Sequence, residues 1–125
     1  MTALDASAVL AFLFQERGGE IVAGVIAGSC LSTVNLSEVL GRFAKDGHDA
    51  HVVGRRLAAA GVEMVPFLAE DAALAASLRP KTDPLGLSLG DRACLALALA
   101  RGVPVLTADR QWGALDLGID IQLIR

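Results

Sequence analysis

The chain has 125 residues, a length that suits one domain over residues 1–125. Hydrophobic residues make up 54% of it and the mean hydropathy is +0.53, but the longest apolar runs fall well short of the ~18 residues that cross a bilayer. The net charge of −3, with four phenylalanines and one tryptophan, argues against a nucleic-acid surface built from basic or stacking side chains.

The first residues and the cysteines indicate the compartment. Residues 1–5 contain no basic segment, and Asp5 interrupts them before an apolar stretch develops, which is unlike a signal peptide. We therefore expect a cytoplasmic protein that does not associate with membranes. Cys30 and Cys94 lie in apolar segments and are predicted to be buried and unpaired. His48 and His51 are predicted to be ordinary surface residues of a helical region.

Short β-like runs alternate with helical patterns along the whole chain. This βα alternation predicts a mostly parallel, twisted sheet of about five strands with helices on both faces. The expected elements, in chain order, are a strand over 2–5, helices over 6–14 and 20–28, a strand over 30–34, helices over 35–47 and 49–61, a strand over 62–67, a helix over 69–78, a loop over 81–87, a helix from 88 onward, and strands over 103–109 and 119–124.

The expected helix after residue 88 has no polar face between Ala93 and Ala100. Such a helix must be covered by the sheet on one side and by another helix or a partner on the other. Together with the high hydrophobic content, this pattern predicts a homodimer.

Four acids fall where the elements of such a sheet begin and end. Asp5 and Asp109 end the first and fourth strands, Glu38 lies one turn into the helix after the second strand, and Asp91 opens the helix before the fourth. Ligands of open parallel sheets bind beyond the carboxyl ends of the strands. If the fourth strand returns beside the first, all four acids face one crevice.

Each acid also has a purely structural explanation as a helix cap or an ion-pair partner. Asp5 and Asp109 can be N-caps, Asn35 with Glu38 and Ser88 with Asp91 have capping-box spacing, and Glu38 can pair with Arg42.

Repulsion weakens the explanation by capping alone. Two carboxylates about 5 Å apart repel by roughly 3 kcal/mol at an effective dielectric constant of 20. A helix dipole returns only ~0.3–1 kcal/mol for an acid at its N-terminus. A close cluster therefore needs a counter-ion such as Mg²⁺ or Mn²⁺, and Ser7, Asn35 and Thr107 are near enough in sequence to orient the carboxylates.

Three stretches, "LDASAVLAFLF", "STVNLSEVLGRF" and "LSLGDRACLALALARGVPVLTADRQW", resemble the PIN-domain ribonucleases of VapC type, toxins of bacterial toxin–antitoxin pairs. The resemblance implies a three-layer α/β/α fold and an endoribonuclease that hydrolyses RNA phosphodiester bonds with Mg²⁺ or Mn²⁺. It also implies a VapB-like antitoxin, whose arginine we expect in the carboxylate cleft.

Residue by residue, the resemblance makes Asp5, Glu38, Asp91 and Asp109 the catalytic and metal-binding acids. Asp5, Asp91 and Asp109 are expected to dominate metal ligation, with Glu38 acting through a water. Thr107 matches the family's hydroxyl beside the last acid. Arg92 or Arg110 can contact substrate phosphate, but a solvated surface role is favoured for both.

Other α/β families lack support. A receiver domain needs paired acids after the first strand and a lysine after the fifth, whereas this chain has "LDAS" and "IQLIR" there. A haloacid-dehalogenase-type phosphatase needs an aspartate where Ser7 stands, and neither a dinucleotide-binding G-x-G-x-x-G nor a P-loop is present. The remaining alternative is a catalytically silent PIN-like protein that binds RNA or a partner.

Overall fold

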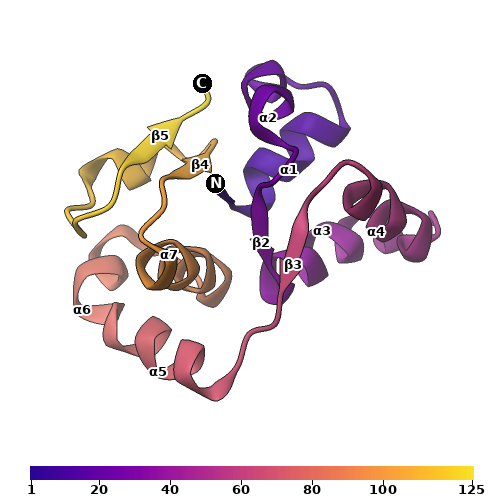
Figure 1. Ribbon diagram of the computed structural model, residues 1–125. Helices are drawn as coiled ribbons and strands as arrows, with labels where there is room; N and C mark the ends of the chain where they lie inside the picture. The colour runs from indigo at the N-terminus through magenta and orange to yellow at the C-terminus, as the bar shows by residue number, and fades with distance from the viewer.

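A five-stranded, entirely parallel sheet with the order β3-β2-β1-β4-β5 forms the centre of the protein, and helices cover both faces (Figure 1). This computed structural model describes all residues, 1–125, and confirms the predicted three-layer α/β/α fold. The strands are β1 (Ala3–Leu4), β2 (Cys30–Ser32), β3 (Glu63–Val65), β4 (Val105–Thr107) and β5 (Ile121–Leu123). The α-helices are α1 (Ala6–Leu13), α2 (Gly19–Val25), α3 (Thr33–Lys45), α4 (Ala50–Ala59), α5 (Ala69–Ser77), α6 (Arg79–Thr82) and α7 (Leu89–Arg101), and two short 3₁₀ helices are η1 (Asp83–Leu85) and η2 (Arg110–Ala114).

The shortest strand, β1, lies in the middle of the sheet. Ala3 pairs with Cys30 of β2 on one side and with Val105 of β4 on the other. The chain builds β2 and β3 outward from β1 in one direction and β4 and β5 in the other, so the strand order reverses between β1 and β4. This reversal is where parallel sheets open a crevice at their carboxyl edge. The predicted return of the fourth strand beside the first is confirmed.

The sheet separates two hydrophobic cores because successive strand residues point to opposite faces. Leu4, Leu31 and Leu106 face the core beneath α1 to α4. Ala3 and its neighbours on β2 and β4 face the core beneath α7, where Leu95 and Trp112 are fully buried. Figure 1 shows the two helical layers on opposite sides of the strands.

The apolar helix α7 is covered within the chain itself. Every residue from Ala93 to Ala98 is buried, and α5 packs against the side of α7 that faces away from the sheet. The prediction of a second covering helix is therefore correct. The homodimer was expected chiefly from exposed apolar surface on this helix, and the structure removes that argument.

The segment 81–87 is not the loop that its prolines suggested. It forms the end of α6 and η1, with Thr82 buried and Arg79 paired with Asp83 at 3.1 Å. Pro80 and Pro84 each stand in the first turn of a short helix, where the missing N–H of proline costs no hydrogen bond.

The second strand is shorter than expected because Ser32 ends it. The Ser32 hydroxyl accepts a hydrogen bond from the Val34 amide at 3.2 Å and caps α3, which begins at Thr33. Asn35 is thus inside the helix, and the capping role predicted for it is wrong.

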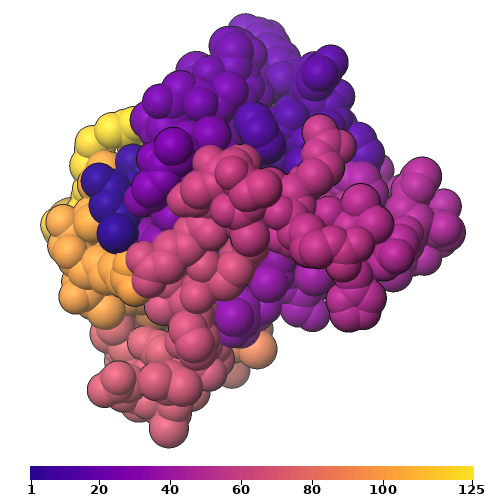
Figure 2. Space-filling view, turned by 45° about the vertical axis from the view of Figure 1, so that its right-hand side comes forward, coloured from indigo at the N-terminus to yellow at the C-terminus, as the bar shows by residue number.

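The outline of the molecule is uneven. In Figure 2 the α5–α6 segment projects downward and α4 projects to the right, with an indentation between them. No helix has both the length and the apolar character that a bilayer span requires.

Candidate active site

The side chain of Asp5 lies at the centre of the candidate site, directly after β1. It is only 3% exposed and caps α1, with its Oδ1 accepting hydrogen bonds from the Ala8 amide at 2.8 Å and the Ser7 hydroxyl at 2.7 Å. Its Oδ2 accepts a hydrogen bond from the Thr107 hydroxyl at 2.6 Å. The predicted cap is therefore present, and Ser7 and Thr107 contact the carboxyl group as expected.

Burial raises the pKa of Asp5 from 3.8 to about 6, although the hydrogen bonds from Thr107, Ala8 and Ser7 favour the charged form. The nearby charge of Asp91 raises the pKa further. No lysine or arginine forms an ion pair with Asp5. The folded protein thus holds a carboxyl group whose charge has no cation to balance it.

Thr107 connects the ends of β1 and β4. Its buried hydroxyl donates to Asp5 and accepts a hydrogen bond from the Asp109 amide at 3.0 Å. Asp109 caps η2, as predicted, by accepting from the Gln111 amide at 3.0 Å through Oδ1. Its Oδ2 makes no hydrogen bond within the chain and is free to bind a ligand.

Asn35 links α3 to α7. The Asn35 Nδ2 group donates to Glu38 Oε2 at 3.0 Å and to the Gly90 carbonyl at 2.9 Å, and its side chain is almost completely buried. The Glu38 carboxyl group lies directly against Gly90. The predicted ion pair between Glu38 and Arg42 is absent, because Arg42 pairs with Asp46 instead at 3.5 Å.

Asp91 and Ser88 form the capping box that their spacing predicted. Asp91 Oδ2 accepts from the Ser88 amide at 2.8 Å, and Ser88 Oγ accepts from the Asp91 amide at 3.2 Å. One oxygen of Asp91 remains without a partner in the chain.

The buried thiol of Cys94 lies within electrostatic reach of three of the acids. Burial raises its pKa well above the usual value, and the charges of Asp5, Asp91 and Glu38 raise it further. Asp109 joins this group through Thr107. The four predicted acids therefore gather at the carboxyl edge of β1, β2 and β4.

The donors match a hard divalent cation in chemistry, since every available group is a carboxylate oxygen. Their spacing does not complete a coordination shell: no three Asp, Glu, His or Cys side chains stand close enough to hold a metal ion together. Metal binding would need the half-exposed acids to turn toward Asp5.

Arg92 does not have the solvated surface role that was expected, and Gly90 was not predicted as part of the site. The Arg92 side chain is only 12% exposed, and its Nη1 donates to the Leu87 carbonyl at 3.1 Å. It therefore fixes the segment before α7, whereas Arg110 is exposed as expected. Gly90 could not be singled out from sequence, because its contacts are with residues 52 to 55 positions away, and no local signal marks them.

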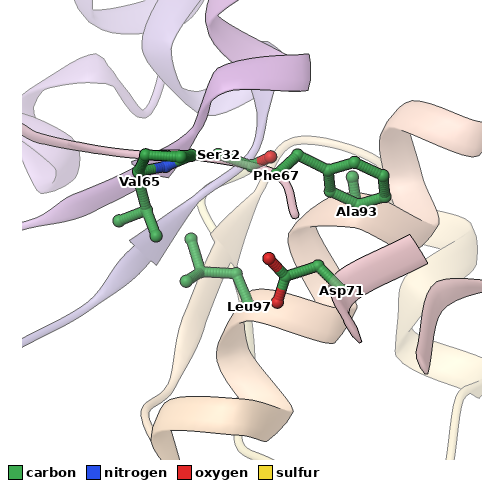
Figure 3. A pocket seen from close by; sticks show the side chains of 7 residues that line it. Ser32, Val65, Phe67, Asp71, Ala93 and Leu97 are labelled. Atoms are coloured by element: carbon green, nitrogen blue, oxygen red, sulfur yellow. The ribbon is translucent and has the colours of Figure 1, made fainter. Parts of the chain in front are cut away.

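A small cavity of about 10 Å³ lies beyond the ends of β2 and β3 (Figure 3). Figure 3 shows the Phe67 ring and the Asp71 carboxylate on its rim, with Ala93 and Leu97 of α7 beside them. This volume is about what one water molecule needs, so the cavity cannot hold a nucleotide.

Comparisons with known proteins agree with this fold. The family model described as PIN domain matches residues 2–117. A toxin–antitoxin complex from Klebsiella pneumoniae is 16% identical with a TM-score of 0.80, covering 100% of this chain and 98% of that chain. DNA-bound VapBC from Salmonella typhimurium is 16% identical with a TM-score of 0.74, covering 99% and 98%. FitAcB from Neisseria gonorrhoeae is 21% identical with a TM-score of 0.66, covering 97% and 96%. No curated protein matches the chain significantly.

Proposed function

Because the chain belongs to the PIN domain family, we propose that it is a metal-dependent endoribonuclease, the VapC-type toxin of a toxin–antitoxin pair. The fold of the structural neighbours, several of which are toxin–antitoxin complexes, supports this assignment. A role against cellular RNA is consistent with the cytoplasmic location predicted from the sequence.

The buried, unpaired Asp5 carboxyl group carries the proposal. A purely structural cap does not need an acid that is 3% exposed, lies near a second carboxylate and has no cation beside it. Such an arrangement destabilises the ligand-free protein, and binding of a cation offsets that loss of stability.

Each acid has a proposed role. Asp5, Asp91 and Asp109 would hold Mg²⁺ or Mn²⁺, and Glu38 would contribute through a water or orient the attacking water. The bound cation would supply Lewis-acid stabilisation of the charge that develops on the scissile phosphate. Thr107 keeps the Asp5 oxygens in place by hydrogen bonding to one of them, and Ser7 does the same for the other. No residue of the group needs to act as a covalent nucleophile.

A catalytically silent PIN protein that binds RNA or a partner is the second candidate. The observation in its favour is that no three of the acids are arranged to hold a metal ion. The two candidates differ in whether the protein binds Mn²⁺ at Asp5.

Cleavage of a mixed single-stranded RNA with Mg²⁺, Mn²⁺ or EDTA tests the proposal. We expect cleavage only with metal, and loss of cleavage in Asp109→Asn, which keeps the Oδ1 cap of η2. Calorimetric titration of the apo-protein with Mn²⁺ should show binding that Asp5→Asn removes. Cleavage that continues undiminished in EDTA would refute the metal mechanism, and absence of both Mn²⁺ binding and cleavage would favour the silent alternative.

We also propose a VapB-like antitoxin that places an arginine between the acids, and a homodimer that buries apolar side chains exposed away from α7, among them Phe14, Ile21 and Val25. An arginine is always charged and presents a planar fork that matches carboxylates. Co-expression should relieve the growth arrest caused by the toxin alone, and light scattering should give the mass of two chains. A strict monomer at micromolar concentration would contradict the dimer.

A further inference from the structure

Gly90 occupies a position in α7 where the backbone does not require glycine. It lies in the first turn of the helix, and its φ is not among the positive values found at other glycines of the chain. Glycine is less favourable than alanine in a helix because it loses more conformational freedom. A buried glycine in ordinary helical conformation therefore needs a reason in its surroundings.

The carboxyl group of Glu38 supplies that reason. A Cβ atom at position 90 would lie within 2.7 Å of both oxygens and the Cδ of Glu38, and these are its three nearest neighbours. No backbone atom of another segment is as close. The space that glycine leaves open is occupied by the end of one flexible side chain from another helix.

Asn35 holds the carboxyl group in that space. One amide group reaches both helices, since Asn35 Nδ2 donates to Glu38 Oε2 at 3.0 Å and to the Gly90 carbonyl at 2.9 Å. Glu38 is otherwise an exposed residue with freely rotating bonds. Between Gly90 and Asn35 its carboxyl group has one location, next to the helix turn that carries Asp91.

We propose that Gly90 is a positioning residue, whose missing side chain lets Asn35 fix the Glu38 carboxyl group beside the N-terminus of α7. The catalytic consequence rests on the proposed nuclease function, whereas the placement of the carboxyl group is a property of the fold and can be tested without activity. A misplacement of about 1 Å in a catalytic group can cost on the order of 100-fold in rate.

Gly90→Ala is the decisive variant, and Gly41→Ala is its matched control. Gly41 lies in the middle of α3, three residues after Glu38, and a Cβ atom there meets nothing within 4 Å. Because Glu38 can swing away into solvent, we expect both variants to fold, with melting temperatures no more than about 3 °C below that of the wild type.

The first measurement does not depend on catalysis. The chain contains one asparagine, so the side-chain amide signal of Asn35 is identified by residue type in a ¹⁵N correlation spectrum. In Gly90→Ala we expect this signal to shift and its solvent exchange to accelerate by about tenfold or more, as in Glu38→Ala, because the carboxylate acceptor is lost. Gly41→Ala should leave it unchanged.

The second measurement is the rate of RNA cleavage at saturating metal. We expect Gly90→Ala to lower kcat by about 10- to 100-fold with little change in KM, and Gly41→Ala to match the wild type. In a Glu38→Ala background, Gly90→Ala should not lower kcat further, because position 90 affects cleavage only through the Glu38 carboxyl group.

An unchanged Asn35 signal in Gly90→Ala would overturn the proposal, as would a fall of more than about 10 °C in melting temperature, which would indicate displaced backbone. Equal kcat losses from Gly90→Ala with and without Glu38 would also overturn it. If the wild type cleaves no RNA, the proposed function fails, and the Asn35 signal still decides the placement of Glu38.

Discussion

Asp5→Asn should stabilise the metal-free protein and, under the proposed function, abolish cleavage of RNA. The asparagine keeps an oxygen for the Ala8 amide and the Ser7 hydroxyl, and its amide nitrogen can donate to the Thr107 hydroxyl. The substitution therefore removes a buried charge without emptying the site.

The size of the effect follows from the pKa of Asp5, which burial raises from 3.8 to about 6. A shift of about 2 units corresponds to roughly 3 kcal/mol at 1.36 kcal/mol per unit. We expect a net gain of about 1–3 kcal/mol after allowing for less favourable hydrogen bonding by the amide. At about 3–5 °C per kcal/mol for a domain of this size, the melting temperature should rise by about 3–15 °C.

The stability gained by Asp5→Asn must increase as the pH rises. The folded protein binds the Asp5 proton more tightly than the unfolded chain does, so the wild type loses stability as pH rises from about 4 through about 6. The variant has no such proton to lose. Its advantage should be absent near pH 4, grow up to about pH 6 and stay constant above pH 7.

Melting curves in EDTA between pH 4 and pH 8 measure this difference, with the exposed Asp116→Asn as the control that should show little change. A variant less stable than the wild type at pH 7.5, or equally favoured at pH 4 and pH 8, would refute the account of Asp5. Addition of Mn²⁺ should stabilise the wild type and leave Asp5→Asn unaffected.

Three further predictions concern the surroundings of the site. Ser88→Ala should destabilise the protein by about 1 kcal/mol, seen in urea unfolding, because it removes the oxygen that caps α7. Leu95→Ala should cost about 2–5 kcal/mol in the same assay, since this side chain is fully buried between α7 and the sheet, and a smaller loss would mean that the core collapses around the cavity. Cys30→Ala and His48→Ala, once folded, should keep kcat within about twofold of the wild type, because neither residue lies at the acid cluster. A larger loss of kcat would mean that the active site lies elsewhere.

Short-range spacing predicted the features that depend on neighbouring residues. The caps at Asp5 and Asp109 and the capping box of Ser88 with Asp91 each involve residues two or three positions apart, and all three are present. Strand ends followed from the βα alternation, which is why four acids distributed over the chain could be expected at one edge.

Contacts between distant segments could not be read in the same way. Asn35 was predicted to be a helix cap because Glu38 follows three residues later. Its amide group instead donates a hydrogen bond to the Gly90 carbonyl, 55 residues away. The polar character of Arg92 suggested exposure, but the Leu87 carbonyl and the packing of α7 bury most of it. The sequence also left the outer surface of α7 available for a partner, because nothing in it indicates that α5 packs there.

The position of β1 in the sheet also bears on synthesis of the protein. β1 is made first, but its β4 partner lies 100 or more residues later, and Thr107 and Asp109 come with that partner. A nascent chain can pair β1 with β2, and β2 with β3, while the other edge of β1 stays open. A ribosome that stops between residues 91 and 105 therefore releases a fragment that carries Asp5, Glu38 and Asp91 but lacks Thr107 and Asp109. Such a fragment cannot assemble the acid cluster, so under the proposed function it should not cleave RNA.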